Sequence, residues 1–190
     1  DLHYIPIPYE CSHLPAAAPS TERLRIIHTP SVPAAKGTHF IEPVLHRIAS
    51  ERNVETVVLT GVSHERVIEE KRRSHIAVEQ VGNLGGTGYG VNSLETLAMG
   101  IPTVTEFTPE YDRFLSGHPF VLATQETLHE TLLRLIDNEL LRRDIAARGK
   151  AWVEQHHGFA NVWQVLLRHV REKSSALAGS LAAGRTLPAP

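Results

Sequence analysis

Short apolar runs alternate along the chain with stretches of helical periodicity. The runs rich in branched residues predict strands at 24–28, 56–60, 75–80, 103–107 and 119–123. Apolar residues recur at helical spacing between these runs and predict helices at 38–51, 64–73 and 92–100. Because strands and helices alternate through short connections, we predict a Rossmann-like α/β domain, with a mainly parallel sheet and flanking helices.

The two ends of the chain have different patterns. Residues 1–22 are rich in proline and alanine and predict an extended lead-in or interdomain segment. The α/β pattern starts at residue 23 and is followed by a helical C-terminal extension at 139–157 and 160–173, so we predict a domain over 23–173. Residues 174–190 lack a strong period and predict a disordered tail.

Composition fits one globular domain. Of the 190 residues, 42% are hydrophobic and 21% are charged. The net charge of −2 argues against a nucleic-acid partner, which would require a basic face. No apolar run approaches the roughly 18 residues of a membrane-spanning helix.

Two residues bear on the cellular compartment and on whether the chain is part of a longer protein. The single Cys11 cannot form an internal disulfide, so we expect a reducing compartment and a cytoplasmic location. The chain begins at Asp1 and its one methionine is Met99, so we expect a piece of a longer protein.

A glycine-dense segment at 81–90, VGNLGGTGYG, follows the third predicted strand. Ligands bind at this edge of parallel sheets, and glycines allow backbone N–H groups to approach a phosphate near the positive end of the next helix. The segment does not match G-x-G-x-x-G, and the chain has no G-x-x-x-x-G-K-[ST], so we disfavour a nicotinamide-dinucleotide site and exclude a P-loop. The alternative is a turn that binds nothing.

Charged residues near this segment each have two interpretations. Asn92 and Glu95 have the spacing of a capping box, but Glu95 could instead accept hydrogen bonds from the vicinal hydroxyls of a ribose. Lys36 lies beside Gly37 in the loop after the first strand. Its charge could contact a diphosphate, or Lys36 could be a solvated surface lysine.

The 12 histidines predict no metal site. His64-Glu65 and His129-Glu130 both lack the second histidine of H-E-x-x-H, and the chain has no G-x-S-x-G elbow of a hydrolase. His28, at the end of the first strand, is the histidine that we expect to face the proposed site.

Taken together, these segments resemble the C-terminal, donor-binding domain of a GT-B glycosyltransferase of the retaining family 4 (group 1) type. The similarity covers about residues 23–170 and includes a loop ending in KG at 36–37. Its most specific part, within GGTGYGVNSLETLAMGIPTV, runs from Gly88 to Pro102 and is similar to the family's EGFGLPLLEAMAXGXPVV. The resemblance implies the C-terminal half of a GT-B fold.

The resemblance also implies roles for individual residues. Lys36 matches the lysine that contacts the donor diphosphate, and Glu95 matches the second Glu of E-x7-E, which holds the ribose; these are the candidate catalytic residues. The loop whose amides meet the phosphates is matched by Gly88, Tyr89, Gly90, Val91 and Asn92. In the family, the base of the donor nucleotide usually packs against a set of residues that this chain matches with Gly61, Val62, Ser63, Gln80 and Val81.

Two positions depart from the family pattern. Thr87 stands where the first Glu of E-x7-E normally contacts the donor sugar, so recognition of the sugar would differ. Ser31 stands where an arginine is common, so donor affinity would be weaker or would depend on another domain.

The function that the resemblance implies is metal-independent, retaining glycosyl transfer from a nucleotide-diphospho-sugar to an unknown acceptor, with no separate cofactor. Catalysis would depend on stabilising the departing nucleoside diphosphate. The missing partner is an N-terminal acceptor domain, without which this fragment would bind donor but transfer no sugar. Any membrane contact would involve that missing part. The two departures favour an alternative, a degenerate, non-catalytic GT-B-like domain that serves as a scaffold or partner-binding module.

Overall fold

The computed structural model describes residues 4–20, 22–84, 88–115 and 117–182, with side chains as far as residue 175. The chain forms two compact units, Cys11–Glu154 and Asp1–Glu10 together with Gln155–Pro190. These bounds differ from the predicted domain over 23–173. Residues 11–20 belong to the larger unit, where Ala17 N–H donates to the Met99 carbonyl at 2.8 Å.

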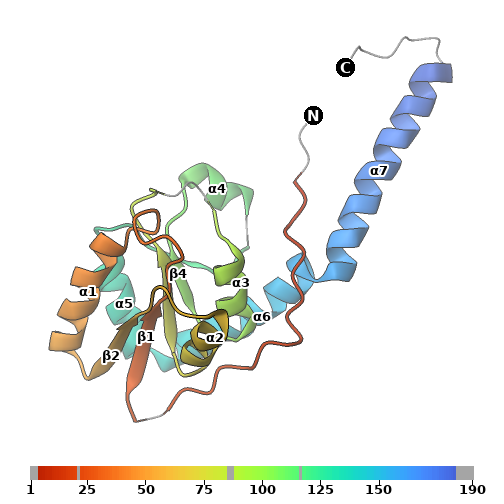
Figure 1. The fold of residues 1–190 in the computed structure, drawn as a ribbon. Coiled ribbons are helices and arrows are strands. Elements are labelled where there is room, and N and C mark those ends of the chain that lie inside the picture. The colour runs from red at the N-terminus through yellow and green to blue at the C-terminus, as the bar shows by residue number, and fades with distance from the viewer. Residues whose placement is uncertain (1–3, 21, 85–87, 116, 183–190) are drawn as a thin grey trace. The chain divides into compact units, whose positions relative to one another are not determined.

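The larger unit is built on a parallel five-stranded sheet in the order β2-β1-β3-β4-β5 (Figure 1). The strands are β1 Leu24–His28, β2 Val54–Val58, β3 Ile76–Gln80, β4 Thr103–Thr105 and β5 Val121–Leu122. The arrangement confirms the predicted Rossmann-like α/β class.

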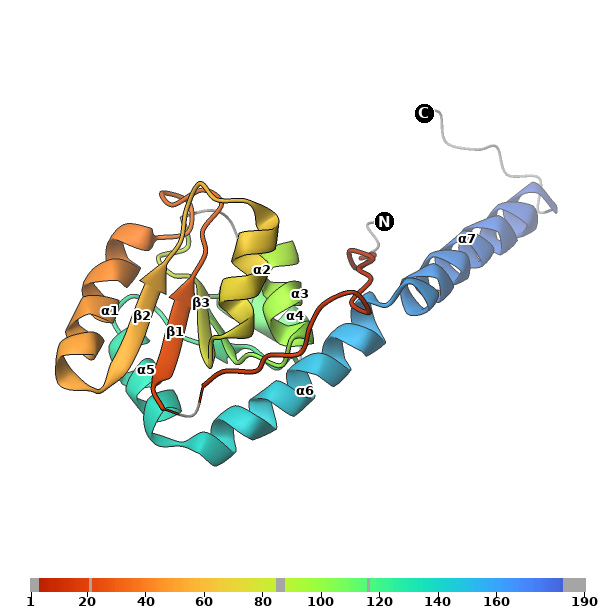
Figure 2. The ribbon, with the colours of Figure 1, turned by 60° about the horizontal axis from the view of Figure 1, so that its bottom comes forward.

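Helices cover both faces of this sheet, α1 and α5 on one and α2 and α3 on the other (Figure 2). The helices are α1 Thr38–Glu51, α2 His64–Arg72, α3 Val91–Ala98, α4 Pro109–Phe114, α5 Leu128–Asp137, α6 Glu139–His157 and α7 Phe159–Ala182. Side chains alternate along a strand, so Ile26 packs with Leu45 of α1 and Leu132 of α5. Ile27 points the other way and packs near Ile68 of α2.

The structure departs from the sequence predictions in several places, and β4 and β5 are shorter than the predicted strands at 103–107 and 119–123. Strand β2 spans Val54–Val58 and so begins two residues before the predicted strand at 56–60. Its first residue, Val54, pairs with Leu24, the first residue of β1. Helix α4 was not predicted, since its six residues are too few to show a hydrophobic period. The predicted disordered tail at 174–190 is helical as far as Ala182, and residues 183–190 lie outside the described part of the chain.

The smaller unit holds α7 and the described residues before Cys11. Tyr9 N–H donates to the His157 carbonyl at 2.8 Å, and the buried His157 ring has Nδ1 2.8 Å from the Ile7 carbonyl. These bonds join the two chain segments of this unit.

Gly37 joins the loop after β1 to the end of β3. Its φ of +68° lies in the left-handed region, and an added Cβ would lie 2.0 Å from the Val81 carbonyl oxygen. The Val81 N–H in turn donates to the Lys36 carbonyl at 3.3 Å. The close backbone approach therefore requires glycine at position 37.

We predict that Gly37→Ala destabilises the chain more than Gly61→Ala does. Gly61 is a matched control, because its φ is +67° but an added Cβ would have no atom within 4 Å. Gly61→Ala should lower the free energy of unfolding by about 1–2 kcal/mol through backbone strain alone. Gly37→Ala should cost about 1–3 kcal/mol more in urea unfolding, because the backbone must shift. Equal losses would show that the contact with Val81 is unimportant.

Candidate functional site

The candidate site lies where two neighbouring strands send their connections to opposite faces of the sheet. Strands β1 and β3 are paired, and each is followed by a loop and a helix, α1 and α3, that pack on different faces. Such a switch point at the carboxyl edge is where parallel sheets bind ligands. A pocket of about 550 Å³ opens there. The loops after β1, β2 and β3 and the elements beside them line it, among them Thr29, Ser31, Lys36, Gly61, Val62, His64, Glu79, Gly90, Val91, Asn92 and Glu95.

Lys36 lines this pocket but has an anionic partner. Its Nζ lies 2.5 Å from Oε1 of Glu79 and donates to Gln80 Oε1 at 3.0 Å. The Glu79 side chain is only 1% exposed, whereas that of Lys36 is 20% exposed. Asn92 donates to the second Glu79 oxygen and accepts from the Thr29 hydroxyl at 3.0 Å. The predicted surface-lysine alternative is therefore wrong, because Lys36 is part of a polar network on the pocket floor.

Glu95 does not form the predicted capping box with Asn92. Helix α3 begins after Gly90, so Asn92 lies inside the first turn, and no side chain caps the helix. The Glu95 carboxylate instead lies 2.5 Å from the Lys71 Nζ through Oε2 and 2.7 Å from the His64 Nε2 through Oε1. Glu95 thus faces the pocket with a cation from α2 behind it.

The Lys71–Glu95 pair is buried, with side chains 0% and 5% exposed. Burial on its own would raise the pKa of the Glu95 carboxyl, but the charge and hydrogen bond of Lys71, together with His64, hold that pKa below its ordinary value. Burial lowers the pKa of Lys71, against the opposing effect of Glu95. Each charge is therefore maintained by the other.

The remaining predicted residues divide into two groups. Gly61, Val62 and the start of α3 line the pocket, and Ser63 caps α2 by accepting from the Arg66 N–H at 3.3 Å. Gln80 and Val81, expected near the base, are buried and are not among the described lining residues. The Gln80 amide instead donates to the Gly88 carbonyl at 3.1 Å and holds the glycine segment.

Tyr89 lies in the glycine segment, but its ring packs into an aromatic cluster. The ring centroid lies 5.1 Å from that of Phe120 and 5.5 Å from that of Trp152. Gly88 and Tyr89 therefore support the segment, while Gly90, Val91 and Asn92 line the pocket. Thr87 lies outside the described residues.

His28 does not face the pocket as predicted. Its ring is fully buried, with Nδ1 2.8 Å from the Val78 carbonyl and Nε2 2.8 Å from the Thr38 hydroxyl. Burial lowers the pKa of His28, so the ring joins β1 to β3 and α1 as a neutral group.

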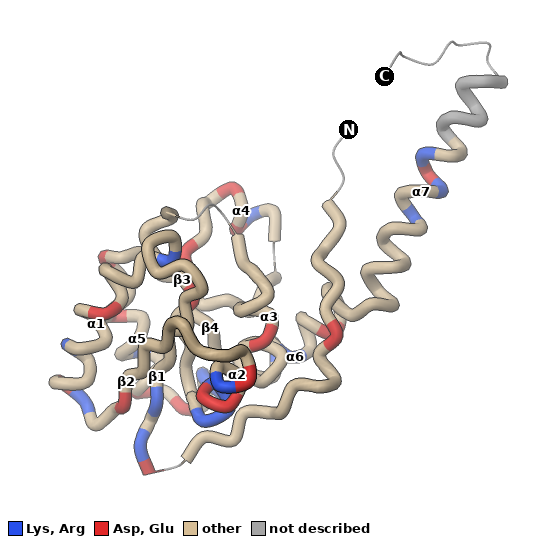
Figure 3. The backbone as a smooth tube through the Cα atoms, viewed as in Figure 1, with Lys and Arg blue, Asp and Glu red and all other residues tan. Residues whose placement is uncertain are grey.

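Sequence reasoning missed Glu79, Lys71 and His64 as site residues. A feature that could have revealed Glu79 is a charged residue inside the strand IAVEQ, all of which is buried. Lys71 lies on α2, where basic and acidic residues follow one another closely (Figure 3), so nothing local marks it as the buried one.

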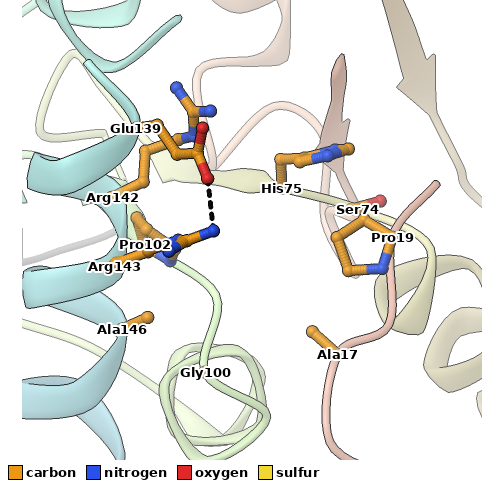
Figure 4. A pocket seen from close by; sticks show the side chains of 10 residues that line it. All are labelled: Ala17, Pro19, Ser74, His75, Gly100, Pro102, Glu139, Arg142, Arg143 and Ala146. Atoms are coloured by element: carbon orange, nitrogen blue, oxygen red, sulfur yellow. Dashed lines mark ion pairs between the residues drawn. The ribbon is translucent and has the colours of Figure 1, made fainter. Parts of the chain in front are cut away.

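A second pocket, of about 350 Å³, lies near the start of β3 and β4, at the opposite edge of the sheet (Figure 4). Its cations already have structural roles. Arg142 donates to the Leu135 and Ile136 carbonyls at the end of α5, and Arg143 pairs with Glu139 at 2.6 Å. The described lining of this pocket includes neither the glycine segment nor a counterpart of Lys36.

Residues 4–20, 22–84, 88–115 and 117–182 contain neither a metal-binding cluster nor a membrane-spanning helix. No cluster of three or more His, Cys, Asp or Glu side chains there is placed to hold a metal ion. Among the same residues, no helix combines the length and apolar character needed to cross a membrane.

Comparison with known families identifies the chain. The model of the glycosyl transferase-like family matches residues 39–168, so the chain belongs to that family. This match covers strands β2 to β5 and the pocket residues from Leu59 onward, whereas β1 and Lys36 lie before it. A comparison with curated proteins finds no match.

Solved structures share the fold at low sequence identity. A sucrose-phosphate synthase from Thermosynechococcus elongatus is 11% identical with a TM-score of 0.67, over 90% of this chain and 52% of that one. WaaG, a glycosyltransferase involved in lipopolysaccharide biosynthesis, is 13% identical with a TM-score of 0.54, over 76% and 46%. Anabaena Alr3699/HepE, in complex with UDP and glucose, is 13% identical with a TM-score of 0.53, over 80% and 48%.

This chain therefore spans about half the length of those proteins. The larger unit has the Rossmann-like fold of the C-terminal domain of group 1 GT-B glycosyltransferases, as the sequence predicts.

We predict that Lys71→Met lowers the free energy of unfolding at pH 7 by about 3–5 kcal/mol, because it leaves the Glu95 charge buried without its cation. Since the Glu95 pKa is depressed in the wild type, its pairing contributes stability above the ordinary carboxyl pKa and loses it only as pH falls through the lower, folded value. In the variant, burial favours the protonated carboxyl, so the deficit should be smaller at pH 5 than at pH 7.

Urea unfolding at the two pH values measures this deficit. Adding Glu95→Gln to Lys71→Met should recover part of the lost stability, because it removes the unpaired charge. Lys150→Met, at an exposed lysine of α6, is the control and should change stability by less than about 0.5 kcal/mol. A deficit that neither acid nor Glu95→Gln reduces would contradict the electrostatic explanation.

Proposed function

We propose that the pocket at the carboxyl edge binds a nucleotide-diphospho-sugar as the donor for glycosyl transfer. The observation that carries this proposal is that Lys36, the start of α3 and Glu95 line one pocket of about 550 Å³. That volume is in the usual range for small-molecule sites. Family membership supports transferase chemistry, and the UDP held by HepE, a protein of the same fold, supports the class of donor.

The proposed arrangement assigns one part of the donor to each group. The diphosphate lies at the N-terminus of α3, where backbone amides carry partial positive charge and no side chain caps the helix. Lys36, partly exposed, supplies a full positive charge there. The ribose hydroxyls donate to Glu95, and the base lies against Gly61 and Val62.

Catalysis in this proposal depends on stabilising the leaving group. As the bond between sugar and phosphate breaks, negative charge grows on the departing nucleoside diphosphate. Lys36 and the α3 amides are preorganised to stabilise that charge without a metal ion. Retention of configuration is proposed from the resemblance to family 4 enzymes. We propose that the acceptor is bound by an N-terminal domain outside this chain, so the present chain alone should bind donor without transferring sugar.

A second candidate function is that of a non-catalytic binding module. The observation that favours it is charge compensation in the pocket, because Lys36 is paired with Glu79 and Glu95 with Lys71. A diphosphate must compete with Glu79 for Lys36, so this pocket attracts anions less strongly than one with an unpaired cation would.

Calorimetric titration with UDP-, GDP- and ADP-sugars tests the proposal. We predict that at least one of them binds at millimolar or lower concentration, and that Lys36→Ala weakens its binding at least about tenfold, the effect of losing a charged hydrogen bond. Lys150→Ala, at an exposed lysine outside the pocket, should leave affinity unchanged.

Because Lys36→Ala leaves Glu79 buried without its cation, a second variant is needed. Lys36→Gln combined with Glu79→Gln removes both charges, keeps side chains able to hydrogen-bond, and should also lose affinity. An absence of heat from all three donor classes would refute the proposal. Unchanged affinity in both Lys36 variants would instead favour the non-catalytic module.

A further inference from the structure

The exposed side chain of His64 covers one oxygen of the buried Glu95 carboxylate. The His64 side chain is 61% exposed and that of Glu95 is 5% exposed, and both residues line the pocket. His64 Nε2 lies 2.7 Å from Glu95 Oε1. A ligand that reaches Glu95 from the pocket therefore meets His64 at the carboxylate.

The two oxygens of Glu95 have hydrogen-bond partners that differ in how easily they can move away. Oε2 is held by Lys71, whose side chain is 0% exposed and whose ammonium also donates to the Asn92 carbonyl at 3.3 Å. Lys71 cannot leave without an unpaired charge remaining in the interior. His64 begins α2 and is largely in solvent, so its ring can turn into water and exchange one hydrogen-bond partner for another. Of these two described partners, His64 is therefore the one that a ligand can replace.

We propose that His64 is the partner that a ribose diol displaces from Glu95 Oε1, so that competition from His64 reduces the preference of the pocket for ribonucleotides over nucleotides without ribose hydroxyls. This inference rests on the proposed function. In the exchange, a ligand hydroxyl donates to Oε1, and the released imidazole N–H donates to water. Lys71 stays in place and keeps the carboxylate ionised and oriented. His64 thus acts through Glu95 as a positioning and specificity-determining residue.

Affinities of UDP, GDP and ADP and of their 2′,3′-dideoxy counterparts, measured by calorimetry on wild type and His64→Ala, test this inference. Removing the competitor should raise affinity for the ribonucleoside diphosphate that binds by about three- to tenfold, the scale of one hydrogen bond. Affinity for the dideoxy compound should change by less than about twofold, because that compound has no hydroxyl for Glu95. A role for His64 in stability alone would not change the ratio between the two ligands.

Two further variants sharpen the test. His64→Gln keeps a donor that can reach Glu95 and should retain most of the wild-type ratio. His129→Ala removes another His–Glu pair, in which His129 Nε2 lies 2.8 Å from Glu51 Oε2 outside the pocket, and should change neither affinity.

The failures are distinguishable. If ribonucleotides bind but His64→Ala changes both ligands equally, or weakens the ribonucleotide, this inference is overturned and the donor site stands. If no nucleoside diphosphate binds any variant, the proposed function is overturned and this inference with it.

Discussion

Two buried carboxylates at the carboxyl edge of the sheet each have a lysine beside them, and these two ion pairs organise the site. Glu79 and Glu95 have side chains 1% and 5% exposed. A lone charge at that depth would be very costly, so each needs a cation and further hydrogen bonds. Lys36 comes from the loop after β1 and Lys71 from α2, so the ion pairs fasten separate crossovers to one pocket floor.

The topology explains why these groups meet at this edge. The connections after β1 and β3 diverge to opposite faces, which leaves a crevice between them whatever the details of the side chains. Lys36 and Lys71, which come from the connections after β1 and β2, are each balanced by a buried carboxylate, Glu79 and Glu95, so the paired groups at this edge carry no excess of positive charge.

The periodic parts of the fold were predictable from sequence, and the long-range contacts of the site were not. Strand β1 and helix α1 match their predicted bounds, because their hydrophobic patterns are strong and local. The capping box failed since Gly90, rather than Asn92, precedes α3. Site roles for Lys36 and Glu95 were predicted from the family resemblance, but their ion-pair partners lie far away in sequence. No local sequence pattern indicates that Lys71, among the many charged residues of α2, is the one that is buried.

The close approach of Gly37 to the Val81 carbonyl has an evolutionary consequence. With the backbones of the two loops locked together, the Lys36 and Glu79 side chains rest on a fixed frame. Exchanges at these two positions would then change the charges at the pocket while the main chain keeps its course. A backbone fixed in this way allows side chains at the pocket to change during evolution while the fold is retained.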